Sequence, residues 1–151
     1  MKRIEEEIQQ KKFRSPHQKA VINLIYTANW LQNKHQGFFK TYGITGQQFN
    51  ILRILKGQHP NSISATNIKT RLLDQNSDVS RLLDRLATKN LLTKQACTKD
   101  KRAFDVFITQ QGLDLLKEID KHQRHIDNVL ALSDDEAHQL SELLDKSRGV
   151  R

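Results

Sequence analysis

The 151-residue sequence predicts a mostly α-helical protein, in which a winged helix-turn-helix lobe is flanked by long N- and C-terminal helices. The first observation is the helical spacing of four apolar residues after Ser77, which buries one face of a short helix. The second is a pair of alternating segments, 91–98 and 103–108, which indicate a two-stranded ribbon. The third is the cationic tip of that ribbon, Lys99-Asp100-Lys101-Arg102. The apolar residues of the short helix are Val79, Leu82, Leu83 and Leu86.

Capping residues mark where the other helices begin and end. The first long helix follows Ser15-Pro16 and ends at Tyr42-Gly43, and the second begins after Thr45 and stops near Gly57. A very short strand at Ile63 precedes a helix-turn-helix pair. The remaining helix starts are Ser64, Asn76 or Ser77, Thr109 and Ser133.

Three helix ends follow from the same signals. The helix from Ser64 is expected to reach Leu73. The short helix after Ser77 is expected to end at Asn90 in a left-handed conformation, because Asn is the best substitute for Gly at such a cap. The helix from Thr109 is expected to continue past Leu130, because its apolar residues keep helical spacing that far.

The long terminal helices predict a homodimer. The helices within 15–42 and 109–148 carry apolar stripes that are too wide for the small lobe at 45–108 to cover. A bundle of these helices from two chains would bury both stripes in a symmetric dimer, with 1–151 forming a single domain. A bundle within one chain is the alternative, and it would leave the protein monomeric.

The charge distribution favours a polyanionic partner. The net charge is +8 and the pI is about 9.7. Residues 66–102 contain nine Lys or Arg against four Asp or Glu, whereas residues 112–151 contain six against nine. The central segment is therefore the part that faces double-stranded DNA if DNA is the partner. The alternative is that the basic residues only keep the protein in solution.

The centre of the chain resembles the MarR family, named for the multiple antibiotic resistance regulator. The segment Leu86-Ala87-Thr88-Lys89-Asn90-Leu91 is similar to the end of that family's recognition helix, with Asn90 in place of the usual Gly. Asp100-x-Arg102 followed by Thr109-x-x-Gly112 is similar to the family's wing motif. The resemblance extends over residues 17–146. It implies a homodimeric, ligand-responsive repressor that binds a pseudo-palindromic operator.

Two groups of residues are the candidates for DNA contacts. The recognition helix would place its side chains in the major groove, where Arg81 can bind guanine through two hydrogen bonds. The cationic wing tip would enter the minor groove, with Asp100 holding the tip in shape. Asp84 is expected to orient Arg81 or Arg85. The alternative for each helix residue is a solvated surface position. The predicted contacts are Ser77, Ser80, Arg81, Arg85, Lys99, Lys101 and Arg102.

The resemblance also implies a small-molecule effector in a crevice between the dimerisation helices and the DNA-binding lobe. The candidate lining residues are aromatic: Tyr26, Trp30, Phe38 and Phe49. Aromatic residues at helical spacing are equally typical of a plain hydrophobic core.

Other chemistry has little support in the sequence. The single Cys97 excludes an intramolecular disulfide, and His122 and His125 lack the further ligands that a metal site needs, so we expect no metal and no cofactor. Whether Cys97 is inert or redox-active stays open. Motifs of common enzymes and apolar segments of membrane-spanning length are both missing, so we expect a cytoplasmic protein that is not an enzyme. The main alternative function is a winged-helix module that binds another protein.

Overall fold

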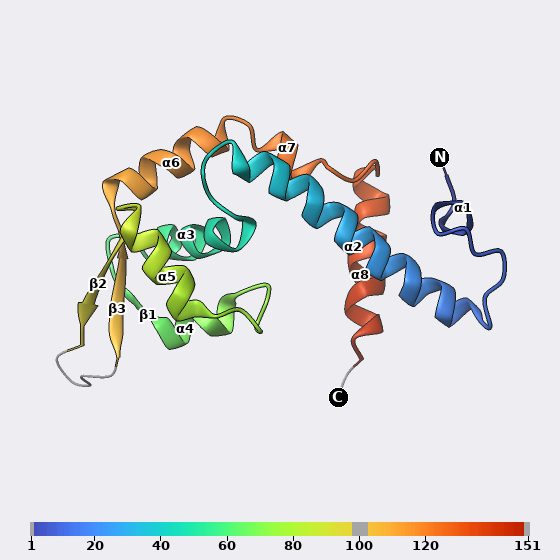
Figure 1. The fold of residues 1–151 in the computed structure, drawn as a ribbon, viewed down its shortest axis with the longest axis horizontal. Helices are drawn as coiled ribbons and strands as arrows, with labels where there is room; N and C mark the ends of the chain where they lie inside the picture. Colours follow the sequence, from blue (N-terminus) through green and yellow to red (C-terminus); the bar gives the residue numbers. More distant parts are fainter. Residues whose placement is uncertain (1, 98–102, 150–151) are drawn as a thin grey trace. The chain divides into compact units, whose positions relative to one another are not determined.

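The computed structural model describes residues 2–97 and 103–149 (Figure 1). The predicted wing-tip residues Lys99, Asp100, Lys101 and Arg102 lie outside the described residues. The chain divides into two compact units, residues 1–121 and 122–151. The first unit contains the helix-turn-helix pair and the ribbon, and the second contains the C-terminal helices.

The elements of the first unit follow one another closely along the chain. In order they are α1 (Ile4–Glu7), α2 (Pro16–Lys40), α3 (Gly46–Gln58), β1 (Ile63–Ser64), α4 (Ala65–Arg71), α5 (Val79–Thr88), β2 (Leu92–Ala96), β3 (Phe104–Ile108) and α6 (Gln110–Asp120). The second unit contains α7 (Arg124–Asp127) and α8 (Asp134–Ser147).

The three strands form a small antiparallel sheet. Its order is β1-β3-β2, so the short strand at Ile63 pairs with Val106 in the middle of β3. The β2–β3 ribbon extends away from the helices at the end where its two strands lead towards residues 98–102 (Figure 1). Strand β1 pairs with Asp105 and Val106 of β3, and the β2–β3 ribbon that it joins has the form of a wing.

One hydrophobic core holds α3, α4, α5, α6 and the sheet together. Its centre is made of aliphatic side chains with almost no exposed surface, because each element turns one apolar face inwards. These side chains are Ile51, Leu52, Leu55, Ile68, Leu83, Leu86, Leu92, Val106, Leu116 and Ile119. The predicted mostly helical fold, with a helix-turn-helix pair followed by a ribbon, is confirmed.

Most predicted helix starts are correct. Ser15, Thr45, Ser64 and Ser133 each accept a hydrogen bond from a backbone N–H in the first turn of the following helix. Asn90 has a φ of 57°, as expected of a left-handed helix end. Residues 4–7 form a helix that the sequence analysis did not predict, and Ile4 is buried.

Three predicted boundaries are wrong. Helix α4 stops at Arg71, and Leu73 is 92% exposed in the turn that follows. The cap of α5 is Asp78, and neither Asn76 nor Ser77 fills that position. The predicted unbroken helix from Thr109 past Leu130 ends at Asp120 and is followed by the single turn of α7.

Candidate nucleic-acid interface

Helix α5 presents a polar face to solvent. Its apolar residues Val79, Leu82, Leu83 and Leu86 are buried, which leaves the opposite side of the helix exposed. Because residues three and four apart share a helix face, the exposed side chains form one continuous surface. That surface consists of Ser80, Arg81, Asp84, Arg85 and Thr88. Three of the predicted DNA contacts, Ser80, Arg81 and Arg85, therefore lie together.

The N-terminal end of α5 is fixed to α3. The Asp78 carboxylate accepts a hydrogen bond of 3.1 Å from the Arg81 backbone N–H, which caps the helix. The Gln47 side-chain amide donates to the Ser77 hydroxyl and to the Asp74 carboxylate, both at 3.0 Å. Ser77, a predicted DNA contact, is thus half-buried in the turn before α5 and holds that turn to α3. Its hydroxyl still has a proton to donate to a phosphate.

The C-terminal end of α5 is tied to α6 by the Thr109-x-x-Gly112 motif. The Thr109 hydroxyl accepts a hydrogen bond of 3.0 Å from the Gly112 N–H and donates one of 2.7 Å to the Asn90 carbonyl. The Thr109 N–H donates to the Leu91 carbonyl at 3.2 Å. One threonine therefore caps α6 and joins it to the chain that leaves the recognition helix.

The ribbon carries a cation beside α5. Lys94 of β2 forms an ion pair with Asp84 of α5. Asp84, which was expected to orient Arg81 or Arg85, thus pairs with a lysine of the ribbon. Beyond β2, the Cys97 N–H donates to the Ala103 carbonyl at 3.0 Å, which extends the pairing towards the tip. The cations predicted to enter the minor groove belong to residues 98–102, outside the described part.

The four aromatic candidates for an effector crevice are distributed along α2 and α3. Phe49 packs against Phe39 with ring centroids 4.6 Å apart, and Phe38 packs edge-on against Phe39 at 5.2 Å. Tyr26 donates its hydroxyl to the Glu7 carboxylate at 2.9 Å, and Trp30 is partly exposed. Phe38 and Phe49 therefore belong to an aromatic cluster around Phe39.

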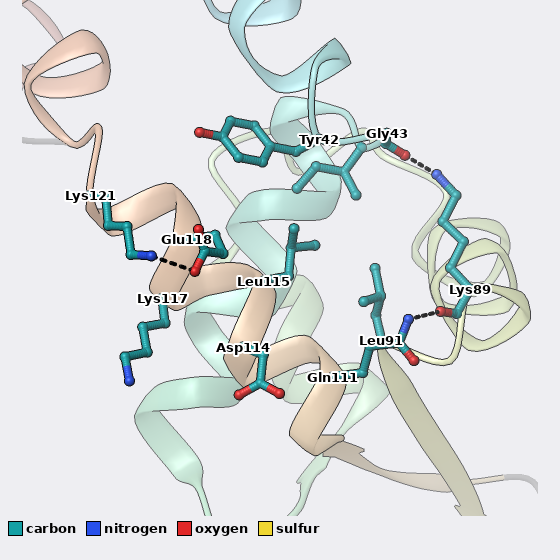
Figure 2. Close-up of a pocket in the computed structure, with 11 residues that line it drawn as sticks. Tyr42, Gly43, Lys89, Leu91, Gln111, Asp114, Leu115, Lys117, Glu118 and Lys121 are labelled. Atoms are coloured by element: carbon teal, nitrogen blue, oxygen red, sulfur yellow. Dashed lines mark hydrogen bonds and ion pairs between the residues drawn. The ribbon is translucent and has the colours of Figure 1, made fainter.

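An open cavity of about 850 Å³ lies elsewhere in the first unit, between the α2–α3 turn, the end of α5 and α6 (Figure 2). None of the four aromatic candidates lines it. Its aliphatic residues are Ile44, Leu91 and Leu115, and its charged residues are Lys89, Lys117, Lys121, Asp114 and Glu118. Figure 2 shows the Lys89 ammonium against the Gly43 carbonyl, with Gln111 donating to the Lys89 carbonyl at 3.5 Å.

The described residues contain no grouping of three or more His, Cys, Asp or Glu side chains suited to a metal ion. His122 and His125 stack edge-on with ring centroids 6.1 Å apart, His122 before the first turn of α7 and His125 within it. Within the same described segments, the structure has no helix with the length and apolar character that a bilayer crossing requires.

Known proteins share both sequence and fold with this chain. A family model for the MarR family matches residues 42–103. The HTH-type transcriptional regulator MgrA of Staphylococcus aureus is 27% identical over 124 residues, which cover 81% of this chain and 83% of MgrA. The HTH-type transcriptional regulator MhqR of Bacillus subtilis is 29% identical and covers 74% of this chain and 75% of MhqR. These relatives are transcriptional regulators.

The similarity includes the fold. The MarR transcription factor from Planctomyces limnophilus is 29% identical, with a TM-score of 0.66 over 89% of this chain and 98% of that one. The family-model match over residues 42–103 and the fold match over 89% of the chain are both to MarR proteins.

Proposed function

We propose that this chain is a winged-helix regulator of the MarR type, which binds DNA sequence-specifically and regulates transcription. The observation that carries the proposal is the polar face of α5. Ser80, Arg81 and Arg85 are exposed together on a helix whose two ends are fixed by hydrogen bonds to α3 and α6. A rigid helix with an arginine-bearing face suits the major groove.

The apolar faces of the terminal helices support a homodimer. Val21 and Ile25 on α2 are 56% and 57% exposed, and Leu143 on α8 is 63% exposed. Apolar side chains gain roughly 25 cal/mol for each Å² removed from water, so a second copy of the chain would be favoured on these faces. A dimer would present two copies of α5 to successive major grooves about 34 Å apart, and its operator would be pseudo-palindromic.

The cavity of Figure 2 is the candidate site for an effector. It combines apolar side chains with three lysines and two carboxylates. Glu118 pairs with Lys121, so a small molecule with an apolar body and an anionic group would bind at Lys89 or Lys117. Lys89, directly after α5, contacts the Gly43 carbonyl across this cavity. A ligand that draws Lys89 away from Gly43 would change how the end of the recognition helix is held. We therefore propose a repressor that is released from its operator by such a ligand.

The experiment that tests the proposal is selection of bound sequences from random double-stranded DNA, followed by sequencing. A DNA-binding regulator of this kind enriches an inverted repeat whose half-sites are about one helical turn apart. Binding to the enriched site should weaken steeply with salt, because lysines and arginines displace counterions from the phosphates. Enrichment of no sequence would favour the alternative, a winged-helix module for a protein partner.

A further inference from the structure

The recognition helix and the wing are joined by a polar contact where the sheet leaves the core. The antiparallel register sets Lys94 opposite Val106 and Ala96 opposite Phe104, so these four residues share one face of the ribbon. In the middle of the ribbon this face is buried at Val106. Towards the tip it emerges into solvent, and Phe104 is 42% exposed.

Lys94 links three elements at that point. Its ammonium forms the ion pair with Asp84 on α5 and lies 5.2 Å from the centre of the Phe104 ring on β3. Its own side chain is only 28% exposed, compared with 63% for Asp84. The Lys94 ammonium therefore has two attractive partners, the Phe104 ring and the Asp84 carboxylate. The two contacts together restrict its position more than either would alone.

Asp84 occupies an unfavourable position for a protein that binds phosphate. It lies one helical turn after Ser80 and one turn before Thr88, in the middle of the exposed face of α5. An unpaired carboxylate there would repel the DNA backbone. The ion pair with Lys94 offsets that charge and directs the carboxylate towards the ribbon.

We propose that Asp84, Lys94 and Phe104 form a clamp that sets the direction in which the wing leaves the recognition helix. Lys94 and Asp84 are then positioning residues, because they act through the two elements that read DNA. The clamp rests on the proposed function. Exposed ion pairs contribute little to folding stability, so its effect belongs to the geometry of binding. Base contacts in two neighbouring grooves require the helix and the wing to keep one relative orientation.

The substitution Asp84→Asn separates this role from simple electrostatics. Removal of a negative charge alone would raise the affinity for every DNA sequence by the same factor. Loss of the clamp instead lowers the ratio of operator affinity to random-DNA affinity. We expect this ratio to fall by about fivefold to a hundredfold, the range that corresponds to losing the contacts to one base pair. The measurement is titration of the full-length protein with the selected operator and with scrambled DNA.

Two further variants sharpen the experiment. Asp145→Asn removes the same charge from the exposed Asp145–Arg148 ion pair of α8, and it should leave the ratio unchanged. Lys94→Met keeps the aliphatic stem over Phe104 but removes the charge, and it should lower the ratio as Asp84→Asn does. The double variant should be no worse than either single one, because members of one clamp are not additive.

The mobility of the wing can be measured without DNA through the single cysteine. Cys97 lies directly after β2, so a nitroxide label attached to it reports on the wing alone. The electron paramagnetic resonance spectrum of the label should show faster motion in Asp84→Asn and in Lys94→Met than in the parent chain. An unchanged spectrum in both variants, or an unchanged affinity ratio with both affinities raised, would overturn the clamp. If the parent chain selects no DNA sequence, the proposed function is overturned. The spectrum of the label would then still test the clamp.

Discussion

Gly112 lies so close to the carbonyl oxygen of Leu91 that no side chain fits between them. A Cβ at this position would also come within 2.8 Å of Cγ1 of Ile108. The requirement for glycine in the Thr109-x-x-Gly112 motif is therefore steric. The first turn of α6 packs directly against the backbone that leaves the recognition helix.

Gly112→Ala should therefore destabilise the fold. The added methyl group overlaps backbone, which cannot rotate away as a flexible side chain can, so we expect a loss of about 1–3 kcal/mol in the free energy of unfolding. Chemical denaturation followed by circular dichroism measures it. Gly57→Ala is the matched control, because nothing lies within 4 Å of a Cβ there. Equal stability of the two variants would contradict the steric explanation.

Arg102→Ala should weaken operator binding without changing thermal stability. Arg102 is predicted to insert a cation into the narrow minor groove, where the negative potential is strongest. Fluorescence anisotropy with the selected operator measures the loss. Lys146→Ala, near the end of α8, removes one positive charge outside the predicted reading elements and serves as the control. If both variants bind equally well, the wing does not take part in recognition.

Arg81→Ala should change which sequence is preferred. Arg81 is exposed on α5 beside Ser80 and Arg85, and a bidentate contact with guanine discriminates by about 1–3 kcal/mol. Repeating the DNA selection with the variant should show relaxed preference at one or two base pairs of each half-site. An unaltered preferred sequence would mean that α5 enters the groove in another orientation.

The exposed apolar faces of α2 and α8 predict a dimer. A single charged substitution on either face should dissociate it. Ile25→Glu and Leu143→Glu each place a carboxylate in the middle of an apolar surface that association would bury. Sedimentation at micromolar concentration should find the parent chain as a dimer and both variants largely as monomers. Val79→Ala, within the core of the first unit, is expected to lower stability but not the extent of association. A monomeric parent chain of 17.5 kDa would remove the basis for two half-sites.

The docking of α1 on α2 should depend on pH. The hydrogen bond from Lys19, with help from backbone bonding, holds the pKa of Glu5 below its usual 4.5, and the hydrogen bond to Glu7 raises the pKa of Tyr26 above its usual 10.0. The Glu5 contact is therefore complete above pH 4.5 and is lost as acid lowers the pH through its depressed pKa. The Tyr26 contact is complete below pH 10 and is lost as the pH rises through its elevated pKa.

The methyl resonances of Ile4, which is buried in α1, report on this docking in NMR spectra. They should be constant at neutral pH and shift towards exposed values at both extremes. Glu5→Gln should abolish the acid transition. Glu6→Gln should retain it, because Glu6 accepts a hydrogen bond from the N–H of Arg3, three residues earlier, and forms no hydrogen bond or ion pair with α2 among the described residues. An acid transition that persists in Glu5→Gln would assign it to another group.

A structural feature can be predicted from sequence when the contacts that cause it join residues close together in the chain. Caps such as Ser15, Thr45 and Ser133 were predictable because each one bonds to a backbone N–H three residues later. The cap of α5 was misassigned because Ser77 is engaged by Gln47, thirty residues earlier in the chain. No pattern among neighbouring residues predicts a contact of this kind.

The break after Asp120 shows a second limit. Apolar residues keep helical spacing across it and no proline or glycine marks it, so the periodicity alone indicates a continuous helix. The pairing of Asp84 with Lys94 shows a third limit, because it depends on how the ribbon is placed against α5. The sequence shows that both residues are charged, but only the folded position of the ribbon brings the lysine to the helix.

Helix α8 has a consequence for how much of the protein persists in a cell. Along its described length, 134–147, none of its residues is buried. If a second copy supplies the missing core, then by mass action the protected fraction rises with protein concentration. Chains made at low copy number would then be more accessible to proteases than chains above the association threshold. The steady-state level of the regulator would then rise more steeply than its rate of synthesis, so modest changes in expression would switch its target genes sharply.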